Sequence, residues 1–389
     1  MTRRSLLEMT LALTAGINTS AALPFNQERK AAGGNWREKK WEIDPRCVLP
    51  RGAASEFDGS VVGDPCVVWD EDVGTWRMFY FAGAGKGYVE SERQLTLGGM
   101  ALSKSTEQIA SGDWHKVGPI PLSNPEDLPL KVDGHKFWVV MDPLRVNHAA
   151  VIDGRYCGLF GTTREPEHIG VAWAEKLAGP WTVLRQPILS PDTRDAAPDG
   201  QRCDTPTAYW LKGQRKTLIF YKAYPLRAQA GQPGSPFGSS SVVAYWGPGE
   251  AVATKGHQIL LPGRRQEFCH GWVGGVQLLH DAERESWYAL LNGSPTPPED
   301  LSNREPAPCL GGWATCEGPN PDGKWKVDRK HSPFLYPASL TQDQLRAGLG
   351  VNFWRHHLVV TPSGRARIFF NSGKYGTEQM YSLVARSRF

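Results

Sequence analysis

Three aspartates that each stand just before an apolar segment are the side chains of this chain best placed to act together as acids and bases. They occur in Gly63-Asp64-Pro65, Met141-Asp142-Pro143 and Cys203-Asp204-Thr205-Pro206. A single aspartate at such a place often does no more than bond to the backbone of a turn. If the fold brings all three together, like charges and burial raise the pKa of at least one carboxyl. The set therefore predicts general acid and base chemistry at one site.

Five segments built around an alanine indicate how the aspartates come together, because they recur at intervals of about 70 residues. The alanines are Ala101, Ala172, Ala244, Ala314 and Ala385. A hydrophobic segment precedes each alanine, and another apolar segment with a polar turn precedes that one. The pattern predicts a meander of three strands that is repeated five times.

A fourth strand is marked in three of the repeats by a tryptophan shortly before a β-branched residue, at Trp114 to Val117, Trp181 to Val183 and Trp325 to Val327. The fifth repeat runs out at Phe389 without such a strand, and Trp41 to Leu49 supplies it from the N-terminal side. We therefore predict an all-β fold, a five-bladed β-propeller closed by an N-terminal strand, which leaves no long sheet edge open. The one helix expected is a short one within residues 340–350.

The first strand of each propeller blade lines the central channel, so the three aspartates are expected on one rim. The other two blades carry histidine at the same position, in Cys269-His270-Gly271 and Phe353-Trp354-Arg355-His356. Polar and aromatic residues at these strand starts are the predicted substrate-binding residues: Asp58, Arg145, His148, His270, Trp272, Arg355 and His356. For the arginines and histidines, an ordinary structural hydrogen bond is the alternative.

This arrangement resembles the five-bladed propeller glycoside hydrolases, the furanosidase and fructosidase superfamily that includes glycoside hydrolase family 43. The resemblance implies that Asp64 is the general base and that Asp142 orients the general acid and tunes its pKa. At the third position the family carries a glutamate, often as Glu-Gly-Pro, and Asp204 stands there as the acid. The resemblance also implies inversion at the anomeric carbon. It implies no cofactor, although some relatives hold a calcium ion on the axis, for which His270 would lie in a suitable blade.

Two further acidic segments are alternative candidates for the catalytic carboxyls. Glu317-Gly318-Pro319 looks like the acid motif, but it follows the third strand of blade four and is therefore expected in an outer turn far from the axis. Asp58 precedes Asp64 on the same loop. It is expected to bind a sugar hydroxyl, or to replace Asp64 as the base if its loop folds inward.

Residues 1–22 have the features of an export signal, with two arginines, a short apolar segment and small residues at the end. The run Thr2-Arg3-Arg4-Ser5-Leu6-Leu7 resembles the twin-arginine signal, and an ordinary secretory signal is the alternative. Residues 23–389 are expected to form one catalytic domain in the periplasm or outside the cell. Their apolar segments are too short for a membrane span, and no basic cluster is interleaved with aromatics as in a nucleic-acid groove.

The predicted function is that of an exported glycoside hydrolase that cleaves a furanoside or a related polysaccharide with carboxyl groups as acid and base. One alternative is a carbohydrate-binding propeller without catalysis. Another is an enzyme that uses phosphate or another sugar as acceptor, which would need a basic pocket such as Arg145, His148 and Arg355 could form. A lyase with His270 or His356 as the base is a more distant alternative.

Overall fold

The computed structural model describes most of the chain from Asn35 to Arg386. The described residues are 35–84, 96–107, 109, 113–128, 136–142, 148–162, 166–194, 196–226, 238–281, 284–295, 309–334, 340–342, 349–350, 352–374 and 376–386. The predicted leader lies outside them, as do Arg145 and most of the predicted helix at 340–350. No helix in these ranges is long and apolar enough to cross a membrane. Three short 3-10 helices have defined bounds: η1 (Asn35–Glu38), η2 (Pro125–Asp127) and η3 (Lys212–Gln214).

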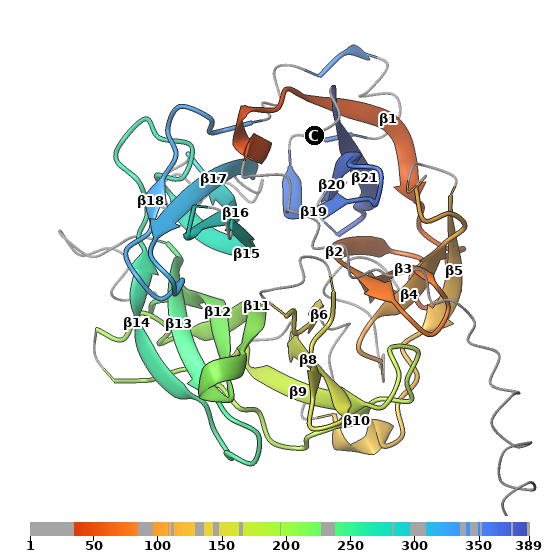
Figure 1. Ribbon diagram of the computed structural model, residues 1–389, viewed down its shortest axis with the longest axis horizontal. Coiled ribbons are helices and arrows are strands. Elements are labelled where there is room, and N and C mark those ends of the chain that lie inside the picture. The colour runs from red at the N-terminus through yellow and green to blue at the C-terminus, as the bar shows by residue number, and fades with distance from the viewer. Residues whose placement is uncertain are drawn as a thin grey trace, which may run out of the picture.

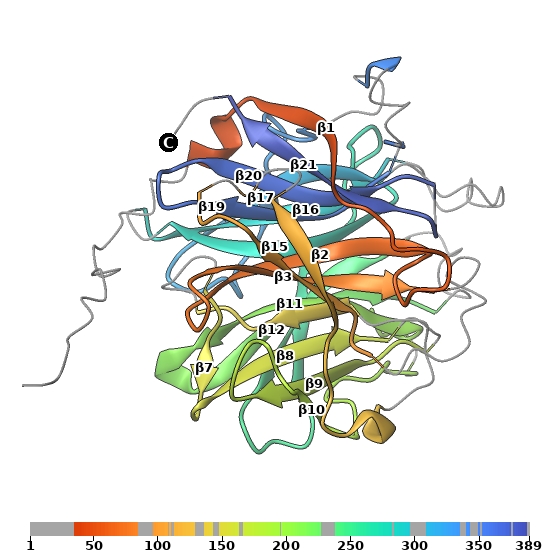
Figure 2. The same ribbon diagram turned by 90° about the vertical axis from the view of Figure 1, so that its right-hand side faces the viewer.

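Five antiparallel sheets surround a central axis, and each forms one blade of a β-propeller (Figure 1). The strands nearest the axis are β2, β6, β11, β15 and β19 (Figure 1). In the side view, blade five with β20 and β21 lies at one edge of the molecule and blade two with β8 to β10 lies at the other (Figure 2). The predicted all-β, five-bladed fold is confirmed.

The blades follow one another along the chain. Blade one consists of β2 (Val61–Asp70), β3 (Thr75–Gly83), β4 (Gly99–Ser103) and β5 (Trp114–Pro119). Blade two consists of β6 (Lys136–Val139), β7 (Val151–Ile152), β8 (Arg155–Gly161), β9 (Ile169–Ala174) and β10 (Thr182–Val183). Blade three consists of β11 (Arg202–Leu211), β12 (Lys216–Tyr224), β13 (Ser240–Trp246) and β14 (Thr254–Leu260). Blade four consists of β15 (Trp272–Asp281), β16 (Ser286–Ser294), β17 (Leu310–Glu317) and β18 (Lys326–Val327). Blade five consists of β19 (Phe353–Val360), β20 (Ala366–Ser372), β21 (Gln379–Ala385) and β1 (Trp41–Leu49).

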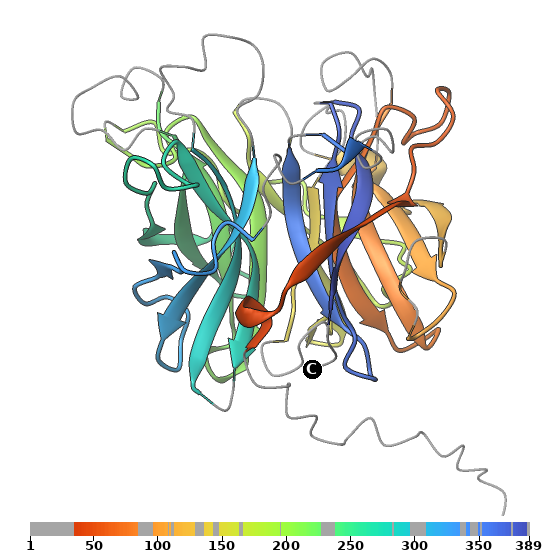
Figure 3. The same cartoon turned by 90° about the horizontal axis from the view of Figure 1, so that it is seen from above.

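The N-terminal strand β1 closes the ring, as predicted. It pairs antiparallel with β21, with Trp41 opposite Ala385, and it crosses the outside of blade five in Figure 3. The segment before β1 reaches blade four, where the buried ring of Trp36 makes an edge contact with Tyr288 at 6.2 Å between centroids. Because β1 completes the sheet of blade five and the chain then continues into β2 of blade one, the two ends of the propeller are held together.

The tryptophans that mark the outer strands pack between neighbouring blades. Trp181 of blade two makes an edge contact with Phe79 of blade one, with ring centroids 6.0 Å apart. In the same way, Trp325 of blade four contacts Phe220 of blade three at 5.8 Å. These large rings fill the space between two twisted sheets, which explains why a tryptophan recurs at this position.

The inner strand of blade two begins earlier than the sequence pattern predicted. Lys136 is its first residue and pairs with the last residue of β8. Met141 lies beside Tyr209, near the end of β11, so Asp142 comes after the end of β6. The pattern was misleading because β7 follows Asp142 and pairs with the first residues of β8, as an inner strand would. The prediction that Asp142 shares a rim with Asp64 is therefore wrong.

The inner strands of blades one, three, four and five each contain a β-bulge near their start. In three of these bulges a residue other than glycine has a left-handed backbone: Asp64 (φ 49°), Thr205 (φ 46°) and Arg355 (φ 55°). Such backbone is costly for a β-branched residue like threonine, and bulges of this kind turn side chains away from the ladder. We call the face at which the inner strands begin the site face, and the other the opposite face.

Candidate active site

A small open pocket lies where the four bulges meet β6, toward the site face. Its lining includes Asp64, Lys136, Trp138, Thr205, Val276 and Arg355. Asp64, Thr205, Val276 and Arg355 are all bulge residues, so the irregularity of the inner strands is what forms the pocket. A concave site with apolar walls and a few charged groups is the usual form of a small-molecule site.

Asp64 reaches the pocket from the bulge of β2. Its side chain is 11% exposed, and its Oδ2 lies 3.6 Å from Nε of Arg355. The backbone N–H of Asp64 donates to Oδ1 of Asn371 at 3.1 Å, which ties the bulge to blade five. Burial raises the pKa of Asp64, and although Arg355 and Lys136 oppose the shift, its direction is upward. Asp64 therefore holds a proton more tightly than a free aspartate does.

Asp204 lies deeper than Asp64 and has the opposite electrostatic setting. Its carboxylate accepts hydrogen bonds from Nζ of Lys136 at 2.8 Å and from Oγ1 of Thr205 at 2.7 Å. A guanidinium nitrogen of Arg355 lies 3.4 Å from its other oxygen. Burial alone would raise the pKa of Asp204, but Lys136 and then Arg355 hold it well below its usual range. Asp204 is consequently ionised, and one guanidinium contacts both it and Asp64.

Glu167 is a third carboxyl at this site, and the sequence analysis missed it. It is 4% exposed, and its Oε1 accepts a hydrogen bond from Arg202 at 3.1 Å. Burial and the neighbouring charge of Asp204 raise the pKa of Glu167 to about 7. The loop before β9 carries it, so no strand-start pattern pointed to it. Near neutral pH Glu167 is therefore partly protonated, whereas Asp204 is ionised.

Lysine and tryptophan side chains form the wall between blades three, four and five. Nζ of Lys222 lies 3.7 Å from the ring centroid of Trp272 and 4.7 Å from that of Tyr224. Trp272 stacks on Trp354, with centroids 5.6 Å apart and planes 6° from parallel. Both tryptophans are partly exposed. Trp272 was predicted as a substrate-binding residue, whereas Lys222 was missed because it lies on the second strand of its blade.

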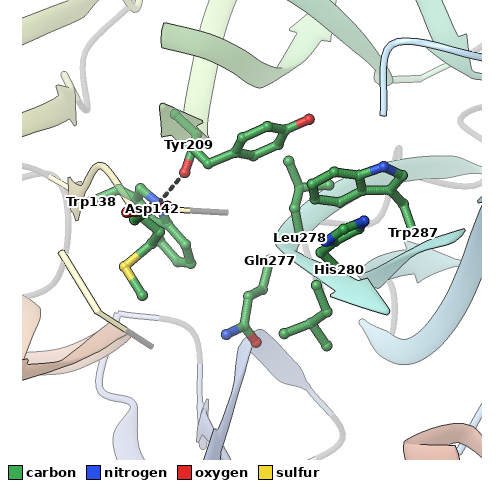
Figure 4. A pocket seen from close by; sticks show the side chains of 10 residues that line it. Trp138, Asp142, Tyr209, Gln277, Leu278, His280 and Trp287 are labelled. Atoms are coloured by element: carbon green, nitrogen blue, oxygen red, sulfur yellow. Dashed lines mark hydrogen bonds between the residues drawn. The ribbon is translucent and has the colours of Figure 1, made fainter. Parts of the chain in front are cut away.

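The structure places Asp142 and His148 toward the opposite face, away from Asp64 and Asp204. The backbone N–H of Asp142 donates to the carbonyl of His148 at 3.2 Å. Asp142 lines a second hollow, shown in Figure 4, with Trp138 beside it and Trp287 and His280 across from it. Arg145, between these residues in the chain, lies outside the described residues.

The two predicted histidines of blades four and five lie in different surroundings. His356 is fully buried against Phe370 and Phe334, and burial lowers its pKa to about 3. A neutral ring enclosed by the core contacts no substrate, so the predicted binding role of His356 is contradicted, as is a role as a lyase base. His270 is partly exposed, and its Nδ1 donates to the carbonyl of Gly263 at 3.1 Å.

Asp58 belongs to a structural contact that two blades repeat. It is 1% exposed, pairs with Nζ of Lys116 at 2.7 Å and accepts a hydrogen bond from the hydroxyl of Tyr80 at 3.0 Å. In blade three, Asp199 pairs with Lys255 at 2.6 Å and accepts from a tyrosine hydroxyl at 2.9 Å. The same trio in two blades shows that Asp58 holds its loop to the outer strands, so the alternative in which it is the base is contradicted.

The remaining acidic motif lies where the sequence predicted it. Glu317 is the last residue of β17, the third strand of blade four, and is exposed. Among the described residues, no group of three or more His, Cys, Asp and Glu side chains is arranged to hold a metal ion. The axial calcium ion therefore stays a prediction from the resemblance.

Comparison with known proteins relates the chain to glycoside hydrolases through its fold. No model of a known protein family and no curated protein sequence matches it. A solved RGII complex of BT0996 is 14% identical, with a TM-score of 0.66 over 91% of this chain and 94% of that one. A thermostable family-43 glycoside hydrolase is 13% identical, with a TM-score of 0.53 over 87% and 91% of the two chains.

A third similar structure comes from the GH130 family of mannoside phosphorylases, which is described as containing glycoside hydrolases that target β-1,2 mannosidic linkages. It is 11% identical, with a TM-score of 0.58 over 92% of this chain and 97% of that one. At these identities the likeness concerns the fold: the chain is a five-bladed β-propeller of the kind found in glycoside hydrolases.

Proposed function

We propose that this protein is a glycoside hydrolase whose acid and base are Asp64 and Asp204. The observation that carries the proposal is that one guanidinium, that of Arg355, contacts both carboxyls at the pocket while their pKa values are shifted in opposite directions. Two carboxyls with separated pKa values are what cleavage of a glycosidic bond requires. The fold shared with solved glycoside hydrolases supports the same interpretation.

The electrostatics favour the reverse of the roles assigned from the sequence. Asp64, whose pKa is raised, is proposed as the acid that protonates the leaving oxygen while the bond to the anomeric carbon breaks. Asp204, which is ionised, is proposed as the base that takes a proton from the attacking water, or as the nucleophile. Arg355 holds both carboxyls in place. Lys136 performs the tuning that the sequence analysis assigned to Asp142.

The residues around Asp64 and Asp204 suit a sugar as ligand. Trp354 directly precedes Arg355, which lines the pocket, and it stacks on Trp272. Aromatic faces are common supports for sugar rings. The proposal retains export by residues 1–22, with action on a furanoside or related polysaccharide outside the cytoplasm. It also retains an inverting mechanism as a prediction from the resemblance.

Kinetics with two kinds of substrate test the assignment. Purified protein is screened on a panel of polysaccharides and on 4-nitrophenyl furanosides, together with Asp64→Asn, Asp204→Asn and the surface control Asp153→Asn. Each of the first two variants should lose ~10²–10⁴-fold in kcat/KM on the polysaccharide. A good leaving group needs little protonation, so the 4-nitrophenyl substrate should rescue Asp64→Asn but not Asp204→Asn.

Rescue of Asp204→Asn alone would restore the roles assigned from the sequence. Full activity of both variants would overturn the proposal. Binding of a polysaccharide without any product would favour the non-catalytic alternative.

A further inference from the structure

We infer that the site contains, next to the pocket, a subsite for an oxyanion carried by the ligand, with Lys222 as the residue that binds it. The inference rests on the proposed function, since it names the class of sugar at the same site. Its ligand is a sugar acid whose carboxylate reaches Lys222 while the ring lies beside the tryptophan pair.

Lys222 carries a buried amine that makes no hydrogen bond or ion pair with an acidic side chain among the described residues, although Asp204 lies opposite it on the neighbouring strand. Its side chain extends from β12, and the residue is 4% exposed. Its ammonium group lies over the faces of Trp272 and Tyr224, and none of the described residues forms a hydrogen bond or ion pair with it. A buried ammonium group in such a setting lacks the partner that normally offsets its desolvation.

The nearby carboxyls are already engaged with other cations. Asp204 is held by Lys136 and Arg355, and Glu167 is held by Arg202. Together with Lys222, four cationic side chains therefore face three carboxyls, of which Asp64 and Glu167 have raised pKa values. When Lys222 is protonated, these basic side chains outnumber the carboxyls, so they would attract a carboxylate carried by a ligand.

Without a ligand, the amine of Lys222 binds its proton weakly. Burial and then repulsion from Arg355 hold the pKa of Lys222 well below its usual range. An oxyanion bound beside the ammonium group would reverse this shift, because an opposite charge favours the protonated form. Binding should then take up a proton from the buffer, which moves to Nζ of Lys222.

The position of Lys222 also indicates how the ligand is recognised. The ammonium group lies over Trp272, which is stacked on Trp354, so the charge and the aromatic pair belong to one wall. A sugar that packs against this wall carries its substituents toward Lys222. A neutral sugar would leave the lysine without a partner, whereas a uronic acid would supply one.

Calorimetry with matched sugars tests the inference. The probes are methyl glucuronide against methyl glucoside and methyl galacturonide against methyl galactoside, which differ only in the carboxylate, and inorganic phosphate alone. In buffers of different ionisation enthalpy, a uronide should bind the full-length wild-type protein with uptake of up to one proton, and the neutral sugar should not. Lys222→Met should weaken uronide binding ~10–100-fold, as expected for loss of a hydrogen bond to a charged group, while Lys176→Met on the surface should not.

The outcomes separate the inference from the proposed function. Equal binding of neutral and acidic sugars without proton uptake would overturn the inference even if the enzyme hydrolyses glycosides. Uronide binding that depends on Lys222 would uphold it even if no substrate is cleaved. Binding of phosphate alone, lost in Lys222→Met, would uphold the oxyanion subsite and assign it to phosphate as acceptor. The wild-type proton measurement decides the question if Lys222→Met does not fold.

Discussion

Nζ of Lys136 lies 2.8 Å from Oδ1 of Asp204, and this contact joins the first residue of the inner strand of blade two to the inner strand of blade three. Lys136 thus stands at the start of the inner strand of blade two, where the sequence pattern predicted Asp142. Among the charges that keep Asp204 ionised in a buried place, that of Lys136 contributes most. The base of the proposed reaction therefore depends on the neighbouring blade.

Replacing Lys136 should move the acidic limb of the pH–rate profile. Asp204 must be ionised, and Lys136 lowers its pKa, so Lys136→Met should raise that pKa and shift the acidic limb of kcat/KM to higher pH. Rate profiles of wild type, Lys136→Met and the surface control Lys176→Met measure the shift. An acidic limb that stays in place in Lys136→Met would show that Asp204 is not the group that must be ionised.

Asp142→Asn should keep kcat/KM close to that of the wild-type protein. Its side chain lines the hollow toward the opposite face with Tyr209 and Trp287, and not the pocket of Asp64. The comparison is with Asp64→Asn on the same substrate. A loss as large as the ~10²–10⁴-fold expected for an acid or base would return Asp142 to the catalytic set.

Asp58→Asn should lower stability without lowering the turnover of the folded protein. The substitution breaks an ion pair between the buried Asp58 and Lys116, for which a loss of about 3–5 kcal/mol in the free energy of unfolding is expected. Asp199→Asn is the matched variant, because Asp199 makes the same contacts in blade three. Urea unfolding and kcat are measured for both. A stable but inactive Asp58→Asn would contradict the structural role.

Trp41→Ala should weaken closure of the ring. Trp41 is 9% exposed at the start of β1, where it pairs with the last residue of β21 and donates from its indole N–H to the carbonyl of Trp36. Removal of a buried tryptophan costs about 3–5 kcal/mol. The control is Val117→Ala in the outer strand of blade one, at a residue that is 50% exposed. Equal melting temperatures of the two variants would show that β1 contributes little to closure.

Glu378→Gln should stabilise the protein at pH 8 but not at pH 4. Burial raises the pKa of Glu378 to about 7, although backbone N–H groups of its own turn lower it. The native state then binds the proton more tightly than the unfolded chain, so this contribution to stability is present at acidic pH and is lost between about pH 4.5 and pH 7. Glutamine carries no charge and should gain about 1–3 kcal/mol at pH 8.

Denaturant unfolding at the two pH values measures this gain, with the exposed Glu175→Gln as control. The same change in unfolding free energy at both pH values would contradict the buried, proton-binding state of Glu378.

Local sequence patterns determined the number of blades, their order and the strand that closes them. The alanine segments and the marker tryptophans repeat because every blade has the same neighbours, and a repeated environment leaves a repeated pattern. Asp64, Asp204, Trp272 and Arg355 could be predicted for the same reason, since they stand near the starts of inner strands. Of these residues, Asp64 and Arg355 line the pocket.

Only the tertiary structure decided which residues share the site. A local pattern does not say whether an aspartate precedes or follows an inner strand. The sequence pattern placed Asp142 before an inner strand because β7, which follows Asp142, pairs with β8 as an inner strand would. Lys136 and Glu167 meet Asp204 only through the packing of blades two and three, and Lys222 lies opposite Asp204 on the second strand of blade three. Their charges act through space and through burial, which depend on the folded arrangement and not on spacing along the chain.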